Sequence, residues 1–322
     1  MKAVRLSRHG EPANVLELVD VPEPAEPGTD QILLEMLYAP INPFDLRIAR
    51  GIVPGPPLPA TLGSEGVARV VAKGSDVSNV DVGDHVHVPL GYATWQERLT
   101  VPSAGLFALS QSADLQQLSM LRVNPPTAAL CLSEFVTLEP GDWIVQDGGT
   151  SAVARGVIAI AKARGLKTVS IVRRAEAIPE IRSAGGDVVL LAGDSIAADV
   201  VQATGNANIK LGLDGIGGAS MAMVSSAISP GATLVVYSAM SLQPGVANQL
   251  DVIFRDISIR GFWLAYPRIH VSGAFAAAVR ESATLIEEGK LHVPVGAVYP
   301  LSDLAEAVRR GESGPRVLLK FR

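Results

Sequence analysis

The segment Asp142–Arg174, DWIVQDGGTSAVARGVIAIAKARGLKTVSIVRR, decides the fold class of this chain. It begins with a short apolar run at Trp143–Val145 and passes through a turn of small residues into an alanine-rich helical pattern. A second apolar run then ends at two arginines. The order of strand, turn, helix and strand predicts a βαβ unit of a parallel sheet.

The turn of this unit has the composition of a phosphate-binding turn, but in a degenerate form. Gly148 and Gly149 are followed by Ser151, so backbone amides and a helix N-terminus are able to approach a pyrophosphate. Ala152 and Ala154 stand where the dinucleotide fingerprint has glycine. A Cβ narrows the room for phosphate at these positions without abolishing it, so the turn alone is a weak signal.

Arg173 and Arg174 at the end of the second strand are a stronger signal. NAD-specific sites place a carboxylate there for the ribose hydroxyls, whereas a guanidinium offers a fork of donors suited to a 2′-phosphate. We therefore expect NADPH. Two alternatives stay open: the arginines are a solvated strand end, or the nearby Glu176 permits NADH.

Composition excludes several classes of protein. The chain has 322 residues, 48% of them hydrophobic and 18% charged, which predicts about two well-packed domains. Its net charge of −5 and its lack of a basic run argue against nucleic acid or an anionic membrane as a partner. The sequence shows neither an apolar signal core nor a membrane-spanning run, so we expect a cytoplasmic protein.

Cysteine and histidine give no metal site. Cys131 is the single cysteine and lies in the apolar stretch AALCLSEF, which predicts a buried, inert thiol. His85 and His87 alternate on one strand face, but no neighbouring cysteine completes a ligand set. We expect no bound metal.

The chain divides by pattern into three parts. Residues 1–117 contain short β-like runs broken by Pro and Gly clusters, typical of a barrel-like β domain. Residues 118–264 alternate apolar strands with helical segments, which indicates a doubly wound parallel sheet and an α/β fold class. Residues 265–322 contain one amphipathic helix and a final strand, and we expect them to return to the first domain.

This layout resembles the medium-chain dehydrogenase/reductase superfamily over essentially the whole chain. Three motifs are similar to the mitochondrial-type 2-enoyl thioester reductases: APINPFDL at 39–46, GSEGVA at 63–68 and VNPPTAALCL at 123–132. The sharpest similarity is VVYSAMSLQP followed by IFRDISIRGFWL. The resemblance implies a GroES-like β-barrel catalytic domain, a Rossmann domain for NADPH, and a homodimer. It also implies a zinc-independent enzyme, because Asn42, Pro43 and Ser64 stand where zinc alcohol dehydrogenases place ligands.

The same resemblance implies a set of cofactor-binding residues. Asn124 would hydrogen-bond the cofactor, the turn after the first strand would cover the pyrophosphate, and the two arginines would hold the 2′-phosphate. The remaining positions would flank the ribose and nicotinamide. The full set is Asn124, Thr150, Ser151, Ala152, Val153, Arg173, Arg174, Tyr237, Ser238, Ala239, Met240, Phe262, Trp263, Leu264 and Arg316. Two purely structural interpretations stay open: Phe262 and Trp263 could be core aromatics, and Asn124 could be a helix cap.

One departure from the family concerns the proton donor. The family's Gly-x-Tyr-Pro turn reads Gly51-Ile52-Val53-Pro54 here, and valine donates no proton. Hydride delivery to the β-carbon of an enoyl thioester builds an enolate, whose α-carbon must then be protonated. Tyr38, Asn42 and Tyr92 are the candidate catalytic residues, with water or a group on the substrate as alternatives.

Three functions remain in competition. The first is NADPH-dependent reduction of the activated C=C bond of a 2-enoyl thioester or a related enone. The second is an NADPH:quinone oxidoreductase, whose acceptor forms a stabilised anion and fits Val53. The third is a non-catalytic NADPH-binding sensor, favoured if Ala152, Ala154 and Val53 mark a decayed site.

Overall fold

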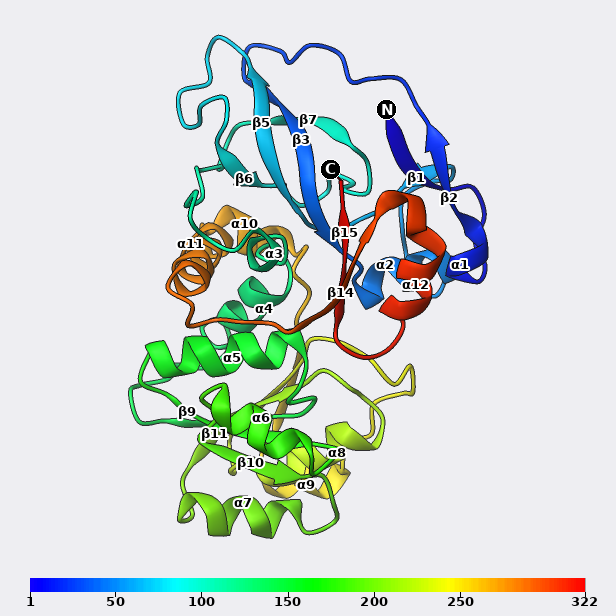
Figure 1. Ribbon diagram of the computed structural model, residues 1–322. Helices are drawn as coiled ribbons and strands as arrows, with labels where there is room; N and C mark the ends of the chain where they lie inside the picture. The colour runs from blue at the N-terminus through cyan, green and yellow to red at the C-terminus, as the bar shows by residue number, and fades with distance from the viewer. Residues whose placement is uncertain (322) are drawn as a thin grey trace. The chain divides into compact units, whose positions relative to one another are not determined.

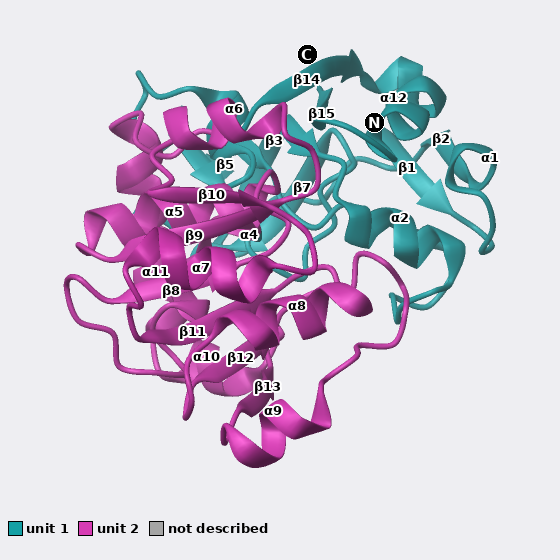
Figure 2. Ribbon diagram, turned by 90° about the horizontal axis from the view of Figure 1, so that it is seen from below, with its two compact units in different colours: residues 1–123, 293–322 teal, residues 124–292 magenta. Residues whose placement is uncertain are grey.

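A computed structural model describes residues 1–321, and the chain forms two compact units (Figure 2). Unit 1 consists of residues 1–123 and 293–322, and unit 2 of residues 124–292. The sequence placed the boundaries at 117/118 and 264/265, so the second crossing differs by 28 residues. The reason is the helix at Ala274–Glu287, which packs within unit 2.

Unit 2 is built on a six-stranded sheet of parallel strands, in the order β10-β9-β8-β11-β12-β13 (labelled in Figure 2; β9, β10 and β11 also in Figure 1). The reversal of strand order lies between β8 and β11, the point at which a doubly wound sheet opens its ligand crevice. This is the predicted α/β architecture. The strands are β8 (Trp143–Gln146), β9 (Lys167–Val172), β10 (Val188–Leu191), β11 (Ile209–Asp214), β12 (Thr233–Val236) and β13 (Ser258–Gly261).

Helices bury both sides of this sheet. Ile158 of one helix and Ile181 of the next join Val172 and Val189 in one apolar cluster. A separate cluster unites Val169 and Ile171 with helical residues further along the chain. Alternate side chains of β9 thus feed two cores, as a doubly wound sheet requires. The helices are α4 (Asn124–Cys131), α5 (Ala152–Ala163), α6 (Ala177–Ser183), α7 (Ile196–Thr204), α8 (Ala219–Ala227), α9 (Gln249–Phe254), α10 (Pro267–Val271) and α11 (Ala274–Glu287).

Helix α11 belongs to unit 2 because its apolar face covers α4 and α5. Phe275, Val279 and Ile286 are buried along that face, at helical spacing. On its polar side, Glu281 forms an ion pair with Arg164, with 2.6 Å between Oε2 and Nη2. The chain leaves unit 2 only after this helix is complete.

Unit 1 has two sheets that surround an apolar core. The larger runs β14-β15-β3-β5-β6, with β7 also paired to β3, and the smaller runs β2-β1-β4. Trp95 is fully buried in the core, and its indole Nε1 donates to the Pro40 carbonyl at 3.2 Å. The strands are β1 (Lys2–Leu6), β2 (Leu16–Asp20), β3 (Gln31–Pro40), β4 (Ala60–Thr61), β5 (Val67–Lys73), β6 (His85–His87), β7 (Arg98–Pro102), β14 (Val295–Pro300) and β15 (Arg316–Lys320).

Short helices complete unit 1. They are α1 (Pro12–Val15), α2 (Pro43–Arg50), α3 (Leu115–Leu118), the 3-10 turn η1 (Leu301–Asp303) and α12 (Leu304–Gly311). Strand β15 pairs with β3 in antiparallel fashion, which returns the end of the chain to the first part of the sequence. Among residues 1–321, no helix has the length and apolarity needed to cross a bilayer.

Candidate active site

The turn after β8 leads directly into the N-terminus of α5. Ser151 caps the helix, and its side-chain oxygen accepts the Ala154 N–H at 3.1 Å. The first amides of a helix have no partner within it, and this cap uses one of them. The other amides of the first turn stand at the N-terminus of a twelve-residue helix, an end that attracts anions, and the predicted pyrophosphate contact of residues 150–153 stays a prediction.

Glycine is required in this turn by space and by conformation. Gly148 has a φ of +54°, and a Cβ at Gly149 would lie 3.1 Å from the Ile171 carbonyl oxygen of β9. Gly156 further along α5 lets the helix pack on α4, because a Cβ there would meet Ala128 at 3.0 Å. The turn therefore keeps the glycines that its own path needs, although Ala152 and Ala154 replace others.

Arg173 and Arg174 follow the last residue of β9, and both are exposed. They lie one strand away from the turn at Gly148, since β9 is the neighbour of β8 in the sheet. This is the position at which a doubly wound fold meets the ribose next to the adenine. The glycine turn, the N-terminus of α5 and two exposed cationic side chains have the chemistry that an NADPH needs, and the contact of the arginines with a 2′-phosphate stays a prediction.

A pair of buried carboxyls lies where β8 and β11 end. Asp147 Oδ1 accepts the Gly215 N–H at 2.8 Å, and its Oδ2 accepts the Ser220 hydroxyl at 2.6 Å. Asp214 Oδ1 accepts the amides of Ile216 and Gly217 at 3.1 and 2.9 Å. The two side chains meet at the point where the strand order reverses.

Burial and a neighbouring carboxyl favour the protonated form of Asp147. Burial is the largest cause that raises the pKa of Asp147 to about 8, and its hydrogen bond and charge interaction with Asp214 contribute to that rise. Asp214 Oδ2 is buried and has no hydrogen-bond partner among the described residues. A proton on Asp147 removes the charge repulsion between the two carboxyls.

The segment after β12 lies against the turn that follows β11. The Tyr237 ring packs on Gly215, where an added Cβ would come within 2.4 Å of the hydroxyl oxygen. Burial raises the pKa of Tyr237, and the Asp147 carboxyl adds to this rise. The Met240 amide donates to the Gly215 carbonyl at 3.1 Å. The predicted set at 237–240 is thereby brought to the carboxyl ends of β11 and β12, with Ser238 half-buried and Ala239 exposed.

The residues after β13 divide into a buried and an exposed part. Phe262 is buried and contacts Phe135 edge to face, with ring centres 6.2 Å apart. Trp263 is 57% exposed and stacks edge-on against Tyr266. The Leu264 carbonyl contacts the His270 ring at 2.9 Å. Phe262 is therefore a core aromatic, whereas Trp263 is available to a ligand.

Unit 1 carries a second buried polar cluster around Asn42 and Glu65. Asn42 begins α2 as its N-cap, and its Nδ2 donates to Glu65 Oε1 at 3.0 Å. Glu65 Oε2 accepts the backbone amides of Arg122 and Val123, both at 2.9 Å. One carboxylate thus joins α2 to the segment at the end of unit 1. Asn124, the next residue, begins α4 as the sequence allowed.

Asp45 and Ser64 form a second layer of this cluster. Asp45 closes the capping box of α2 by accepting the Asn42 amide at 3.1 Å, and it also accepts the Ser64 hydroxyl. Asp45 is 1% exposed, and burial raises its pKa to about 7. Ser64 is half-buried. The serine therefore connects a buried acid to the surface of unit 1.

Arg316 of β15 supplies positive charge to the cluster. Its Nη1 donates to Asn42 Oδ1 at 3.0 Å and to the Ile41 carbonyl at 3.4 Å. Burial lowers the pKa of Arg316, and the charges of Glu65 and Asp45 oppose that change. In this structure Arg316 holds the α2 cap, so its predicted contact with a cofactor stays a prediction.

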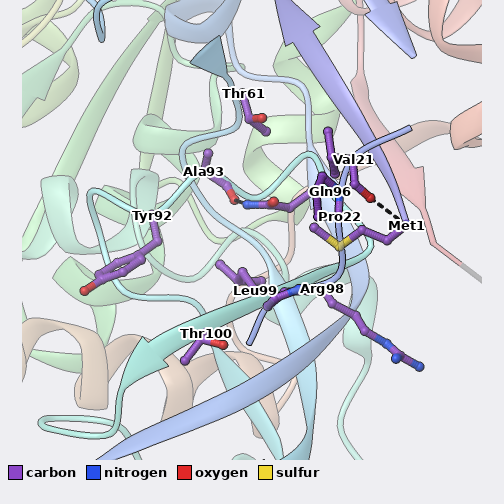
Figure 3. Close-up of a pocket in the computed structure, with 11 residues that line it drawn as sticks. Met1, Val21, Pro22, Thr61, Tyr92, Ala93, Gln96, Arg98, Leu99 and Thr100 are labelled. Carbon is purple, nitrogen blue, oxygen red and sulfur yellow. Dashed lines mark hydrogen bonds between the residues drawn. The ribbon is translucent and has the colours of Figure 1, made fainter. Parts of the chain in front are cut away.

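Tyr38 and Tyr92, the other two candidate catalytic residues, lie on different segments of unit 1. Tyr38 is half-buried on β3, opposite Val67 and Lys320. Val53 packs against the apolar core after α2. Tyr92 lines an open surface depression of about 420 Å³ together with Met1 (Figure 3). The described residues that line this depression do not include Asn42 or Glu65, and the catalytic roles of Tyr38, Asn42 and Tyr92 stay predictions.

Sequence reasoning left four acidic groups out of the site. Asp147 and Asp214 each end an apolar strand, and neighbouring parallel strands bring such ends together. Asp45 and Glu65 are charged residues in motifs of apolar and small residues, which is a signal for a partnered buried charge. In both units, an acidic residue within an apolar stretch of sequence was the signal that could have predicted these buried carboxyls.

Cys131 is buried as the sequence predicted, whereas the strand face of His85 and His87, expected to be half-exposed, has His85 half-buried and His87 fully buried. Cys131 is buried, and burial raises its thiol pKa, so the reactive thiolate is disfavoured. His87 is buried on β6 and contacts Phe107 edge-on at 5.1 Å. No group of three or more His, Cys, Asp or Glu side chains within residues 1–321 is arranged to hold a metal.

Comparison with known proteins identifies the family. Residues 28–111 match the alcohol dehydrogenase GroES-like domain, and residues 184–317 match the zinc-binding dehydrogenase domain. The mitochondrial enoyl-acyl-carrier-protein reductase of Rattus norvegicus is 33% identical over 317 residues, which covers 96% of this chain and 84% of the relative.

Solved structures share the fold. Etr1p, an enzyme of Candida tropicalis, was solved with NADP and crotonyl-CoA; it superposes with a TM-score of 0.88 at 22% identity and covers 99% of each chain. The Escherichia coli quinone oxidoreductase with NADPH gives a TM-score of 0.87 at 21% identity and covers 99% of this chain and 100% of its own. By sequence and by fold, this chain belongs to the family of mitochondrial-type enoyl-acyl-carrier-protein reductases, within the medium-chain dehydrogenase/reductase superfamily.

Proposed function

We propose that this protein reduces the C=C bond of a 2-enoyl thioester with NADPH. The observation that carries this proposal is the pair Arg173 and Arg174, exposed at the end of β9 beside the glycine turn and the N-terminus of α5. A relative named for this activity at 33% identity supports the substrate class. NADPH, when bound, supplies the hydride.

The residues of unit 2 would bind and orient the cofactor. The free amides of α5 and the turn at Gly148 would take the pyrophosphate, and the arginine pair would take the 2′-phosphate. The segment around Tyr237 would position the nicotinamide end, since it lies at the carboxyl ends of β11 and β12. Each of these roles is testable by binding alone.

Quinone reduction is the second candidate, and Val53 is the observation that favours it. A quinone accepts hydride to give a stabilised anion, so that reaction needs no dedicated donor to carbon. A neighbour of the same fold is a quinone oxidoreductase solved with NADPH. A non-catalytic sensor is the remaining alternative, and it predicts binding without turnover.

The deciding experiment measures NADPH oxidation with crotonyl-CoA and, separately, with a simple quinone, and repeats both with NADH. Thioester turnover with a preference for NADPH supports the proposal. Turnover of quinone only supports the second candidate, and NADPH binding without oxidation supports the sensor.

The cofactor preference has its own control. Arg173→Ala with Arg174→Ala is expected to weaken NADPH binding by tenfold or more while NADH binding changes little, because only NADPH carries the 2′-phosphate. Arg182→Ala, an arginine at the end of α6, is the matched control for lost surface charge. Equal losses for both cofactors would contradict the assignment of the pair.

We also propose a homodimer through the edge strand β13. This strand pairs only with β12 among the described strands, and all four of its residues are exposed. Ile253 and Phe254 of α9 are 68% and 78% exposed, and apolar residues beside an open edge indicate a covered surface. Light scattering on a size-exclusion column checks this, and Phe254→Asp is expected to give monomers.

A cytoplasmic location is the remaining part of the proposal. The relatives are mitochondrial by name, which favours the other compartment. Fractionation of cells that express the full-length protein decides between the two.

A further inference from the structure

Helix α5 carries a buried arginine that none of the predicted cofactor contacts uses. Arg155 lies in the first turn of the helix and is 7% exposed. Its Nη2 donates to Oε1 of Glu180, which stands on α6 and has a half-exposed side chain. A charged side chain is rarely buried this deeply without a partner of opposite charge. The ion pair joins α5 to α6 within unit 2.

Helix α6 follows directly after the arginine pair, Arg173 and Arg174. The Arg174 carbonyl accepts the Ala177 amide at 3.1 Å, so the chain enters a helical path at once. Glu180 follows Arg174 by six positions, which is about 9 Å at the helical rise of 1.5 Å per residue. The Debye length in physiological salt is about 8 Å, so a charge on Glu180 acts on the arginine pair and on an anion bound there.

Apolar packing holds α6 in place independently of the ion pair. Ala177 and Ile181 of this helix are buried in one cluster with Ile158 of α5 and Val172 of β9. Burial of these side chains keeps the helix against the sheet by the hydrophobic effect. The ion pair therefore governs the charge at the surface of α6 more than the position of the helix.

The arginine pair itself has no anionic partner in the described part of the chain. Both guanidinium groups are exposed, and neither forms an ion pair or a side-chain hydrogen bond within residues 1–321. We propose that Arg155 is a specificity-determining residue, which neutralises Glu180 and so keeps the arginine pair free for the 2′-phosphate of NADPH. This inference rests on the proposed contact of the arginine pair with that phosphate.

The charges of the segment from Arg173 to Glu180 show why one more cation matters. The segment contains two arginines and two acids, Glu176 and Glu180. With Arg155 on Glu180, one positive charge remains in excess, and without Arg155 that excess disappears. A phosphate monoester carries about −1.5 to −2 charges at pH 7, whereas NADH has a neutral hydroxyl at the same position. Arg155 thus favours NADPH over NADH without contact with either.

The test measures the dissociation constants of NADPH and NADH by fluorescence, without an enoyl substrate. Arg155→Gln frees Glu180, and we expect NADPH to bind about fivefold more weakly while NADH stays within about twofold. Glu180→Gln removes the acid and is expected to leave NADPH binding equal or tighter. The double variant carries neither charge and is expected to return to within about twofold of the unaltered protein.

The effect of Glu180→Gln alone distinguishes charge from fastening. If the ion pair served only to fasten α6, either single substitution would break it, both would weaken NADPH binding, and the double variant would not recover. High salt gives a second check, because the difference between Arg155→Gln and the unaltered protein is expected to shrink as the charges are screened. Glu176 and Asp194, the exposed acids that follow β9 and β10, are the same in every variant.

A second ion pair of α5 provides the matched control. Arg164, at the other end of the helix, pairs with Glu281 of α11 at 2.6 Å. Arg164→Gln breaks this pair far from the arginine pair and is expected to leave both dissociation constants within about twofold. Arg155→Lys keeps the positive charge and is likewise expected to retain the preference for NADPH.

Two outcomes overturn the proposal. The first is an Arg155→Gln variant with an unchanged ratio of the NADH and NADPH dissociation constants. The second is a Glu180→Gln variant that weakens NADPH binding by itself, and this half-exposed substitution tests the proposal even if Arg155→Gln does not fold. If the unaltered protein shows no preference for NADPH, the contact of the arginine pair with the 2′-phosphate is wrong, and the inference falls with it.

Discussion

The two units bury acidic groups in different electrical surroundings. In unit 1, Asp45 and Glu65 lie in a cluster that also contains Arg316. In unit 2, Asp147 and Asp214 receive hydrogen bonds from backbone amides and one serine, all of them neutral donors. The Arg316 charge offsets part of the burial that raises the pKa values of Asp45 and Glu65, whereas the groups that oppose the raised pKa of Asp147, the Gly215 amide and the Ser220 hydroxyl, are neutral.

Removing the Glu65 carboxylate is expected to have the largest effect on stability. Glu65→Ala takes the acceptor away from two backbone amides and from Asn42, and it removes the charge opposite Arg316. We expect a loss of about 3 to 5 kcal/mol in the free energy of unfolding, measured in urea. Glu65→Gln keeps an acceptor and is expected to lose less. Equal losses would show that the charge carries the whole effect.

Gly63 tests how tightly the segment between β4 and β5 is held against the core of unit 1. Gly63 has a φ of +101°, and an added Cβ would lie 2.4 Å from Thr94 Oγ1 and 2.5 Å from Trp95 Cδ1. Gly83 has nearly the same φ, +99°, but nothing lies within 4 Å of its added Cβ. Gly83→Ala thus measures backbone strain alone, about 1 kcal/mol.

Gly63→Ala is expected to cost about 2 kcal/mol more than Gly83→Ala in thermal or urea unfolding, because of the added clash in a packed core. A difference near zero would mean that the segment around Gly63 yields to the added Cβ.

The carboxyl pair of unit 2 predicts a pH dependence of stability. The folded pKa of Asp147, about 8, lies above the ordinary aspartate value of 3.8, so the folded protein holds a proton that the unfolded chain releases. Stability is therefore greatest at low pH in this window and falls on the order of 1 kcal/mol per pH unit as pH rises toward 8.

Asp147→Asn should flatten this slope, since an amide does not titrate and fills the same space. Urea unfolding at pH 5, 6, 7 and 8 measures it for both proteins. A slope that survives the substitution would place the proton elsewhere. Asp142→Asn is a suitable control, because the Glu139 amide and Lys210 lower the pKa of this half-buried carboxyl.

Closing the space between Gly215 and Tyr237 is expected to have the smallest effect on stability. Gly215→Ala adds a Cβ that the Tyr237 ring must leave, and the ring is able to move because it is half-buried. We expect a loss of about 1 kcal/mol and a larger relative loss in NADPH affinity. Unaltered affinity would remove Tyr237 from the cofactor site.

Much of the fold was predictable because local pattern and global architecture agree. The run from Asp142 to Arg174 forms β8, α5 and β9 as expected, since a buried parallel strand and an alanine-rich helix have distinct periods. Strand β11 was harder to see. Gly212 interrupts its apolar run, and the structure shows that a Cβ there would meet Ile228 and Val224 at 2.9 Å.

The candidate site was predictable only where its residues belong to one continuous sequence motif. The turn before α5 and the arginines after β9 belong to one strand–turn–helix–strand run, so their positions at the ends of the neighbouring strands β8 and β9 were predictable. Asn42 was named, but its contact with Glu65 joins residues 23 positions apart through tertiary packing. The Asp147–Asp214 pair depends in the same way on which strands become neighbours. No local pattern fixes such pairings.

The most direct test of the central claim follows the two hydrogens into the product. Crotonyl-CoA is reduced once with NADPH that carries deuterium at the transferable nicotinamide position, and once with ordinary NADPH in heavy water, and the product is examined by NMR. The account predicts butyryl-CoA with deuterium at the β-carbon in the first experiment and at the α-carbon in the second. NADPH consumed without saturated thioester, or deuterium from NADPH at the α-carbon, would contradict it.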